Sequence, residues 1–352
     1  MNLIWKNLMP PAVPALMLAA GLSVCMGASA QAGKPVELAF SSWIPPTHVL
    51  MKDFMIPWGQ QVEKETEGRV RINFLPKAVT NPQGHLDAVR TGVTDLAFIS
   101  HSFYPGRFDL MKLLILPFSG NGAQSTSLAA WRIYDKYLRP ANEHRGIVLL
   151  GVYGHGPGGV YTTKKKIEKI EDFDGLKIRI GGGISADVAK VLKVNAVVKP
   201  APESFELMST GVVDGVFFPP ESVASFRLDD IVKFATVFPG GLYADLHGII
   251  MNEDAFNKLA DRDKAIVRKV SGENIARMGG KAWGDADVAA LSSLKAKKVE
   301  FTEASPSLIT AIKARTDMFE KEWLATAKAK GIDGPMVLKE FRAELARIEA
   351  GK

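Results

Sequence analysis

Short runs in which hydrophobic and polar positions alternate predict several β-strands along the chain. Residues 36–41 and 69–74 have the two-residue period of a strand with one buried face. Shorter apolar runs predict further strands at 95–99, 147–153 and 176–180. Helical spacing is found between them, at 49–66, 86–90 and 185–192. Strands that alternate with helices are typical of an α/β fold, which is the fold class we expect.

The last third of the chain has helical spacing almost throughout. Residues 263–295 contain no proline and predict one long helix, with a kink at Gly279-Gly280. Residues 307–350 predict two more amphipathic helices.

Two segments of the chain resemble each other, and we call this similarity the internal echo. Residues 86–100 resemble residues 205–219, because each has helical spacing, then Thr-Gly-Val, then an aspartate two positions on and a short apolar run. The glycine suits the position after a helix, where a positive φ is needed. Unless the similarity is coincidence, it indicates two lobes built on similar units, and such lobes usually hold a ligand in the cleft between them.

The first thirty residues have the layout of a secretory signal peptide. Lys6 is their only charged residue, residues 12–27 are apolar or small, and Ala28-Ser29-Ala30 provides a small-x-small cleavage pattern. A membrane anchor is the main alternative, but the apolar run is shorter than the roughly 20 residues that a span needs. Lipoprotein processing at Cys25 is a third possibility. It is weakened by Val24, because a small residue is expected just before such a cysteine. We therefore expect cleavage after Ala30 and a soluble exported protein.

Composition and charge exclude several classes of protein. Apolar residues are 47% of the 352 and the formal charge is +6, so the chain is not disordered. The single cysteine rules out a disulfide scaffold and would leave with the signal peptide. The longest basic run is 164–166, so the basic stripe of a nucleic-acid binder is missing, and we expect no nucleic-acid partner.

A glycine-rich segment at 154–159 matches G-x-G-x-x-G and follows a predicted strand. A dinucleotide site needs a helix to begin inside this motif, but Pro157 interrupts it and β-prone residues follow. We interpret the segment as a mobile crossover between lobes and expect no cofactor.

Arg179 is the strongest candidate for a residue that binds an anionic ligand. It ends a predicted strand and precedes three glycines and a helix. Strand ends line the ligand crevice in α/β folds, and a helix N-terminus attracts anions. An arginine there offers a planar donor pair that matches a carboxylate. The pattern equally allows a surface arginine paired with a nearby acid.

Catalytic and metal sites lack recognisable patterns. The six histidines form neither H-x-H nor H-E-x-x-H, so we expect no metal site. No G-x-S-x-G elbow is present, although spacing alone does not exclude a catalytic triad. Aromatic residues gather at expected loop ends, which suggests an apolar pocket wall, although each alone is more typical of a core.

Several motifs together resemble the solute-binding proteins of tripartite ATP-independent periplasmic (TRAP) transporters, of the DctP type. They run in order across nearly the whole mature chain. The most specific is Asp-Phe-Asp-Gly-Leu-Lys-Ile-Arg-Ile at 172–180. The others are 42–48 (Ser-Trp-Ile-Pro-Pro-Thr-His), 66–70, 84–92, Glu203 and 210–215.

The resemblance implies a two-lobed periplasmic binding protein, similar to type II, with a long helix that spans the hinge. The first lobe would comprise 31–156 and 245–284, and the second 157–244 and 285–352. The receptor would close around an organic acid and deliver it to a small and a large membrane subunit. The family's ligand-pairing arginine falls on Arg179. Besides it, we expect ligand contacts from Trp43, His48, His101, Tyr104, Phe217, Phe218, Glu221 and Tyr243.

Two departures from the family pattern bear on the ligand. Many members have a second arginine where this chain has Gly159, and many have Glu-Asn-Pro where this chain has Val-Phe-Phe at 216–218. These changes favour a monocarboxylate with aromatic character over a strongly polar ligand. The alternatives are a secreted α/β enzyme acting on a carboxylate and a binding protein without a permease that serves as a sensor.

Overall fold

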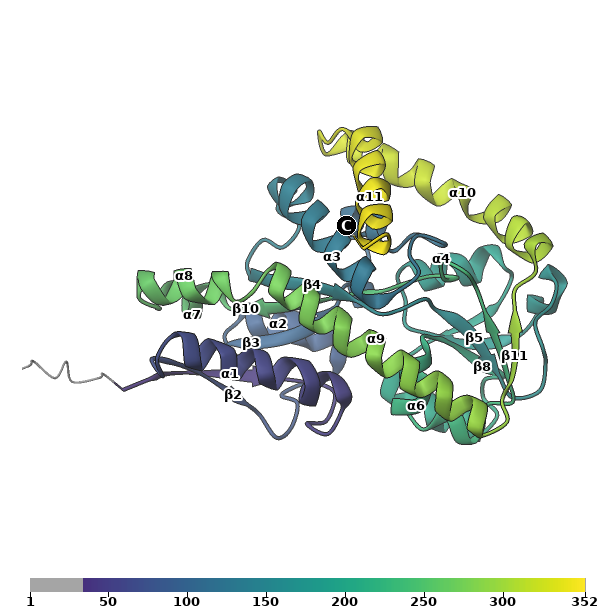
Figure 1. The fold of residues 1–352 in the computed structure, drawn as a ribbon, viewed down its shortest axis with the longest axis horizontal. Coiled ribbons are helices and arrows are strands. Elements are labelled where there is room, and N and C mark those ends of the chain that lie inside the picture. Colours follow the sequence, from purple (N-terminus) through teal and green to yellow (C-terminus); the bar gives the residue numbers. More distant parts are fainter. Residues whose placement is uncertain (1–33, 352) are drawn as a thin grey trace, which may run out of the picture. The chain divides into compact units, whose positions relative to one another are not determined.

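The computed structural model describes residues 34–351, and the predicted signal peptide with Cys25 lies outside them (Figure 1). The described chain forms two β-sheets with helices packed around them, the two-lobed α/β fold that the sequence predicts. No helix within this part of the chain is both long and apolar enough to cross a membrane.

The first sheet has five strands in the order β2-β1-β3-β10-β4. Strand β1 pairs in parallel with β2 and β3, and β10 runs antiparallel between β3 and β4. The strands are β1 (Val36–Ser41), β2 (Val70–Phe74), β3 (Leu96–Ser100), β4 (Val148–Gly154) and β10 (Leu246–Met251). We call this sheet and its helices the first lobe.

The second sheet has six strands in the order β11-β9-β5-β8-β6-β7 and defines the second lobe. Strand β6 pairs in parallel with β7 and β8, and β5 runs antiparallel between β8 and β9. The strands are β5 (Gly159–Thr162), β6 (Lys177–Ile180), β7 (Asn195–Val198), β8 (Gly215–Phe218), β9 (Phe234–Val237) and β11 (Glu300–Glu303).

Eleven α-helices surround the sheets in the described chain. They are α1 (Ile56–Glu65), α2 (His85–Arg90), α3 (Ala123–Ile133), α4 (Ile184–Val191), α5 (Ser204–Ser209), α6 (Pro220–Ser225), α7 (Glu253–Asn257), α8 (Asp261–Lys269), α9 (Glu273–Ala296), α10 (Pro306–Ala329) and α11 (Gly334–Glu349). The two predicted C-terminal helices are α10 and α11.

The internal echo is a structural repeat. Helix α2 leads to β3 in the first lobe, and α5 leads to β8 in the second. Gly92 and Gly211 follow the helices with φ of 73° and 75°. Asp95 Oδ2 accepts the N–H of Ala39 on β1 at 2.8 Å, and Asp214 Oδ2 accepts the N–H of Lys177, the first residue of β6, at 2.9 Å. Each aspartate therefore ties its strand to the parallel neighbour, as the matching sequences predict.

The helical stretch predicted at 263–295 is divided into α8 and α9, and α9 is the long helix that the resemblance implies. Gly272, the residue before α9, has a φ of +58°, which favours glycine, and it lies against the Trp131 ring, where a Cβ would come within 2.8 Å of a ring carbon. Helix α9 contacts β4 and α3 of the first lobe and also α6 of the second lobe. Figure 1 shows it running past both sheets.

The chain crosses between the sheets at adjacent places. Residues 154–159 lead from β4 to β5, so the G-x-G-x-x-G segment is a crossover and no helix begins in it. The return crossing at 242–245 runs beside it, since Gly158 N–H donates to Tyr243 O at 2.9 Å and Leu242 N–H donates to Gly158 O at 2.9 Å. The two crossings and α9 connect the lobes beside the cavity described below.

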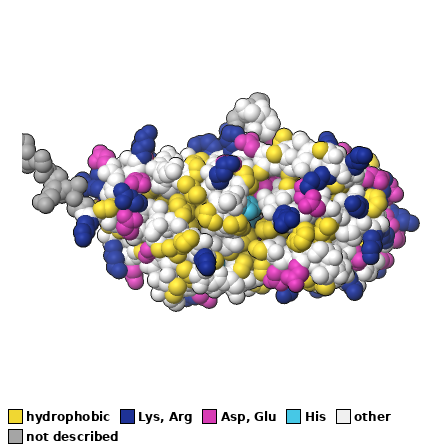
Figure 2. All heavy atoms as spheres, turned by 90° about the horizontal axis from the view of Figure 1, so that it is seen from below, with side chains coloured by type: hydrophobic (Ala, Val, Ile, Leu, Met, Phe, Trp, Pro, Cys, Tyr) yellow, Lys and Arg dark blue, Asp and Glu magenta, His cyan; other side chains and the backbone are white. Residues whose placement is uncertain are grey.

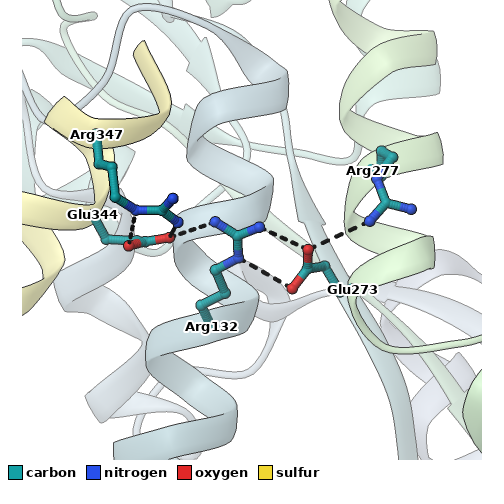
Figure 3. Close-up of polar contacts among 5 residues, drawn as sticks. All are labelled: Arg132, Glu273, Arg277, Glu344 and Arg347. Atoms are coloured by element: carbon teal, nitrogen blue, oxygen red, sulfur yellow. Dashed lines mark hydrogen bonds and ion pairs between the residues drawn. The ribbon is translucent and has the colours of Figure 1, made fainter. Parts of the chain in front are cut away.

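A charged network ties the C-terminal helix to two other helices (Figure 3). Arg132 of α3 donates to both oxygens of Glu273 at the start of α9, at 2.7 and 3.1 Å, and to Glu344 of α11 at 2.5 Å. Arg347 also donates to Glu344, and Arg277 lies 3.4 Å from Glu273. Helix α11 is thus attached to α3 and, through Arg132, to the start of α9.

Candidate functional site

A cavity lies between the two sheets. Its wall combines residues of both lobes with one residue of α9. The lining residues used below are Trp43, Ile44, His48, Phe98, Ser100, Ser102, Phe103, His155, Arg179, Phe218, Glu221, Phe226, Tyr243, Asp245, His247 and Trp283. On the face shown in Figure 2, hydrophobic side chains surround a histidine near the middle.

Arg179 is the one Lys or Arg among the described residues that line the cavity. It is the penultimate residue of β6 and is almost fully buried, at 2% exposure. Its Nε and Nη2 donate to Lys199 O at 2.9 and 2.6 Å, and its guanidinium stacks 4.5 Å from the centre of the Phe218 ring. Burial lowers the pKa of Arg179 to about 10, opposed by Tyr243 and Asp245. It stays charged at neutral pH.

No carboxylate lies within 4 Å of Arg179 in the described chain, and its Nη1 has no hydrogen-bond partner there. The alternative of a surface arginine paired with an acid is therefore excluded. A buried cation without a carboxylate in direct contact is unfavourable, because it has lost its hydration and the charge of Asp245 acts on it only from a distance. An anion bound at the free side of the guanidinium would remove this cost.

The glycine loop after Arg179 packs directly on the first lobe. Gly183 has a φ of +56°, and a Cβ there would come within 2.6 Å of Ser102 Oγ and 2.9 Å of Ser102 Cβ. Ser102 follows the end of β3, so this contact joins the lobes. Any side chain at 183 would separate them.

Aromatic rings form much of the rest of the wall. Trp43 stacks on Phe98 with ring centres 4.8 Å apart, and Phe218 stacks on Phe226 at 5.8 Å. The indole N–H groups of Trp43 and Trp283 are buried without hydrogen-bond partners. The cavity therefore offers flat apolar surfaces from both lobes and two unused donors.

A second contact between the lobes lies at the edge of the cavity. His48 Nε2 of the first lobe is 3.4 Å from Glu221 Oε1 of the second, and both side chains are buried. Ser222 and Ser225 donate to the Glu221 carboxylate at 2.9 and 2.5 Å. Burial lowers the pKa of His48, and Glu221 partly opposes this effect.

Asp245 adds a carboxylate to the same cavity. Its Oδ1 accepts hydrogen bonds from Ser102 Oγ at 2.5 Å and from the N–H of Leu246 at 2.8 Å, and its Oδ2 accepts one from Ser100 Oγ at 2.6 Å. Two neighbouring histidines stay neutral at pH 7, because burial lowers the pKa of His155 to about 4 and that of His247 to about 3.

The structure brings together six of the nine residues expected to bind ligand: Arg179, Trp43, His48, Phe218, Glu221 and Tyr243 all line the cavity. Whether they contact a ligand stays a prediction.

His101, Tyr104 and Phe217 lie away from the cavity wall, and each has a structural reason. His101 is bound to Leu246 O at 3.0 Å and to His144 at 2.9 Å in a buried cluster. The Tyr104 hydroxyl accepts the N–H of Leu86 at 3.2 Å beside a separate small pocket. Phe217 points to the other face of the sheet from Phe218, because side chains alternate along β8.

Sequence reasoning missed a polar group of the wall: Ser100, Ser102, His155, Asp245 and His247. The echo could have found Ser100, because residues 86–100 end at Ser100 just as residues 205–219 end beside Phe218. Asp245 ends the return crossing and His247 follows it, and the crossing has no sequence pattern of its own. Among residues 34–351, no group of three or more His, Cys, Asp or Glu could hold a metal ion.

Two lobes joined by crossing segments, with a buried arginine in an aromatic cavity between them, are typical of a solute receptor. The family model for bacterial extracellular solute-binding proteins of family 7 (DctP) matches residues 40–326, and the chain belongs to this family. The chain is accordingly a solute-binding protein and not an enzyme, so the alternative of a secreted α/β enzyme is not supported.

Individual relatives are similar over most of their length. A TRAP periplasmic solute-binding protein from Bordetella bronchiseptica, with bound (R)- and (S)-mandelate, is 54% identical with a TM-score of 0.87, covering 89% of this chain and all of that one. One from Rhodoferax ferrireducens, in complex with copurified benzoate, is 25% identical with a TM-score of 0.81, covering 89% and 98%. The outer membrane transporter protein TsaT of Comamonas testosteroni is 26% identical over 310 residues, 88% of this chain and 91% of TsaT.

Proposed function

We propose that this chain is the periplasmic receptor of a TRAP transporter and that it binds small aromatic monocarboxylates in the cavity between its lobes. The observation that carries the proposal is Arg179, a buried cation with no carboxylate partner, set beside aromatic rings. The mandelate and benzoate complexes of the similar proteins support this ligand class.

The charges of the cavity favour one carboxylate over two. Arg179 supplies its only Lys or Arg side chain, whereas Glu221 and Asp245 place two acidic groups in the wall. A Cβ at Gly159, where the family resemblance leads us to expect a second arginine, would come within 2.9 Å of Thr236 O. The second carboxylate of a dicarboxylate would therefore lack a cation and would lie near the acidic side chains.

Binding would be coupled to closure of the lobes. A ligand shifts a conformational equilibrium only by binding one state more tightly. We place the ligand carboxylate on Arg179 of the second lobe and its ring against Trp43 of the first, so that the full set of contacts exists only when the lobes are together. The first lobe would comprise 31–156 and 245–284, and the second 157–244 and 285–352.

Delivery would require export and membrane partners. We propose that residues 1–30 are a signal peptide cleaved after Ala30, and that the loaded receptor docks transiently on the small and large membrane subunits of the transporter. The sensor alternative differs in having no permease, and transporter genes beside this one would favour delivery.

Calorimetry with benzoate and mandelate tests the site. Arg179→Ala is expected to weaken binding by roughly 2–5 kcal/mol, because the buried carboxylate would lose its only cation. Arg227→Ala is the matched control, since Arg227 also stacks on a phenylalanine, 5.6 Å from the centre of Phe205, but does not line the cavity. Unchanged affinity in Arg179→Ala would overturn the site, and thermal stabilisation by small hydrophilic dicarboxylates alone would overturn the ligand class.

A further inference from the structure

Asp245 lies in the cavity wall with one hydrogen-bond acceptor position unused. A carboxylate has about four acceptor positions, two on each oxygen. Oδ1 is occupied by Ser102 and the N–H of Leu246, whereas Oδ2 accepts only from Ser100. His247 Nε2 is 4.0 Å from Oδ2, beyond hydrogen-bond distance, and no other hydrogen bond to Oδ2 is found within residues 34–351. The second position of Oδ2 is therefore open.

The Asp245 carboxylate also disfavours binding of an aromatic acid that has no hydroxyl group. An acid bound at Arg179 brings a negative charge into a cavity that already contains Asp245, and like charges in a buried site repel. The neighbouring His155 and His247 do not offset that charge, because burial keeps both neutral. A ligand with a hydroxyl near its carboxylate would donate to Oδ2 and turn an unfavourable neighbour into a partner.

We propose that Asp245 is a specificity-determining residue that accepts a hydrogen bond from a ligand hydroxyl, so that the receptor selects aromatic 2-hydroxy acids over the same acids without the hydroxyl. This inference rests on the proposed function, because it places the ligand carboxylate on Arg179. In this inference, Asp245 at the end of the return crossing recognises the ligand hydroxyl beside that carboxylate.

Mandelate and phenylacetate form the matched probe pair, since they differ only by this hydroxyl. Calorimetry on the wild-type protein is expected to show tighter binding of mandelate by about tenfold or more, the strength of a hydrogen bond to a charged group. Equal affinities would overturn the inference, and this comparison needs no variant. If neither acid bound, the proposed function itself would fail, which keeps the two failures distinct.

Asp245→Asn separates recognition from a structural role. Without the charge, mandelate is expected to bind more weakly and phenylacetate more tightly, because the charged acceptor and the repulsion are lost together. A merely structural aspartate would weaken both acids alike, and that result would overturn the inference. Asp95→Asn is the control, since Asp95 holds the N–H of Ala39 outside the cavity and its loss should leave the ratio of the two affinities unchanged.

Discussion

Burial leaves one ionisable side chain of this protein charged at neutral pH and shifts another toward its neutral form. Arg179 stays charged although burial lowers its pKa, whereas Asp287 on α9 is shifted toward its neutral form. Asp287 Oδ1 accepts the N–H of Glu221 at 2.8 Å, and burial together with the Glu221 charge raises the pKa of Asp287 to about 8. The folded protein therefore holds a proton that the unfolded chain releases near pH 4.

Asp287→Asn is expected to change how stability depends on pH. The raised pKa means that folding stability in the wild type falls as the pH rises from about 4 to about 8. Asparagine keeps an acceptor for Glu221 N–H without a charge, so the variant should be more stable than the wild type at pH 9, by about 1 kcal/mol or more, and not at pH 5. Urea unfolding at both values checks this.

The control for that experiment is Asp285→Asn on the same helix. Asp285 is exposed and paired with Lys281 at 2.6 Å, so its replacement should give the same small effect at pH 5 and pH 9. A stability difference between wild type and Asp287→Asn that did not change with pH would contradict the assignment.

Sequence reasoning at the residue scale identified Arg179 and five further residues of the cavity wall, but it missed the five polar residues named above. Arg179 could be predicted because a strand end, three glycines and a helix start coincide there. Asp245 could not, because its importance depends on Ser100 and Ser102, more than 140 positions away, whose contacts arise only when the lobes fold. Phe217 and Phe218 show the same limit, since which of two adjacent rings faces a cavity depends on strand register.

At the scale of elements, the loop between β6 and α4 makes one of the contacts between the lobes. Gly183→Ala is expected to weaken ligand binding by about tenfold, because a Cβ against Ser102 opposes closure and the ligand must offset that cost. Calorimetry with mandelate measures the loss.

Gly175→Ala provides the matched control. Gly175 has a φ of +74° and nothing within 4 Å of its Cβ position, so its replacement strains the backbone without touching the other lobe. Both variants should lose thermal stability, whereas only Gly183→Ala should lose affinity. Equal affinities in the two would show that closure does not depend on this contact.

Most elements were predictable because their patterns are local. The alternating runs became β1 and β2, and the echo became a true repeat because each copy contains its own turn glycine and aspartate. The break between α8 and α9 was missed since Ser271-Gly272 lies inside strong helical spacing. There, packing of Gly272 on Trp131 overrides the local preference.

At the scale of the whole molecule, the network around Arg132 holds α11 to α3 and the start of α9 (Figure 3). Hydrogen bonds from Arg347 and Arg132 lower the pKa of Glu344 to about 2, although burial opposes them. A lowered carboxyl pKa contributes stability that is present above the unfolded value near 4.5 and lost as the pH falls toward 2.

Glu344→Gln is therefore expected to destabilise the protein by about 1 kcal/mol at neutral pH. The difference from wild type should shrink between pH 4.5 and pH 3, as measured by urea unfolding. Glu320→Gln is the control, because Glu320 of α10 pairs with the exposed Arg342 of α11 and should matter little. A difference that stayed constant down to pH 3 would contradict the role of the Glu344 charge.

The enclosure of the cavity by both lobes has a consequence for timing. Because the glycine loop rests on Ser102 and Glu221 faces His48, an acid bound as proposed would leave only after the lobes part. Its residence time would then include the waiting time for that opening, so acids with different fits should differ mainly in their dissociation rates. If the chain delivers its ligand as proposed, such slow escape would keep the acid bound during diffusion and would leave its release to the encounter with the membrane subunits.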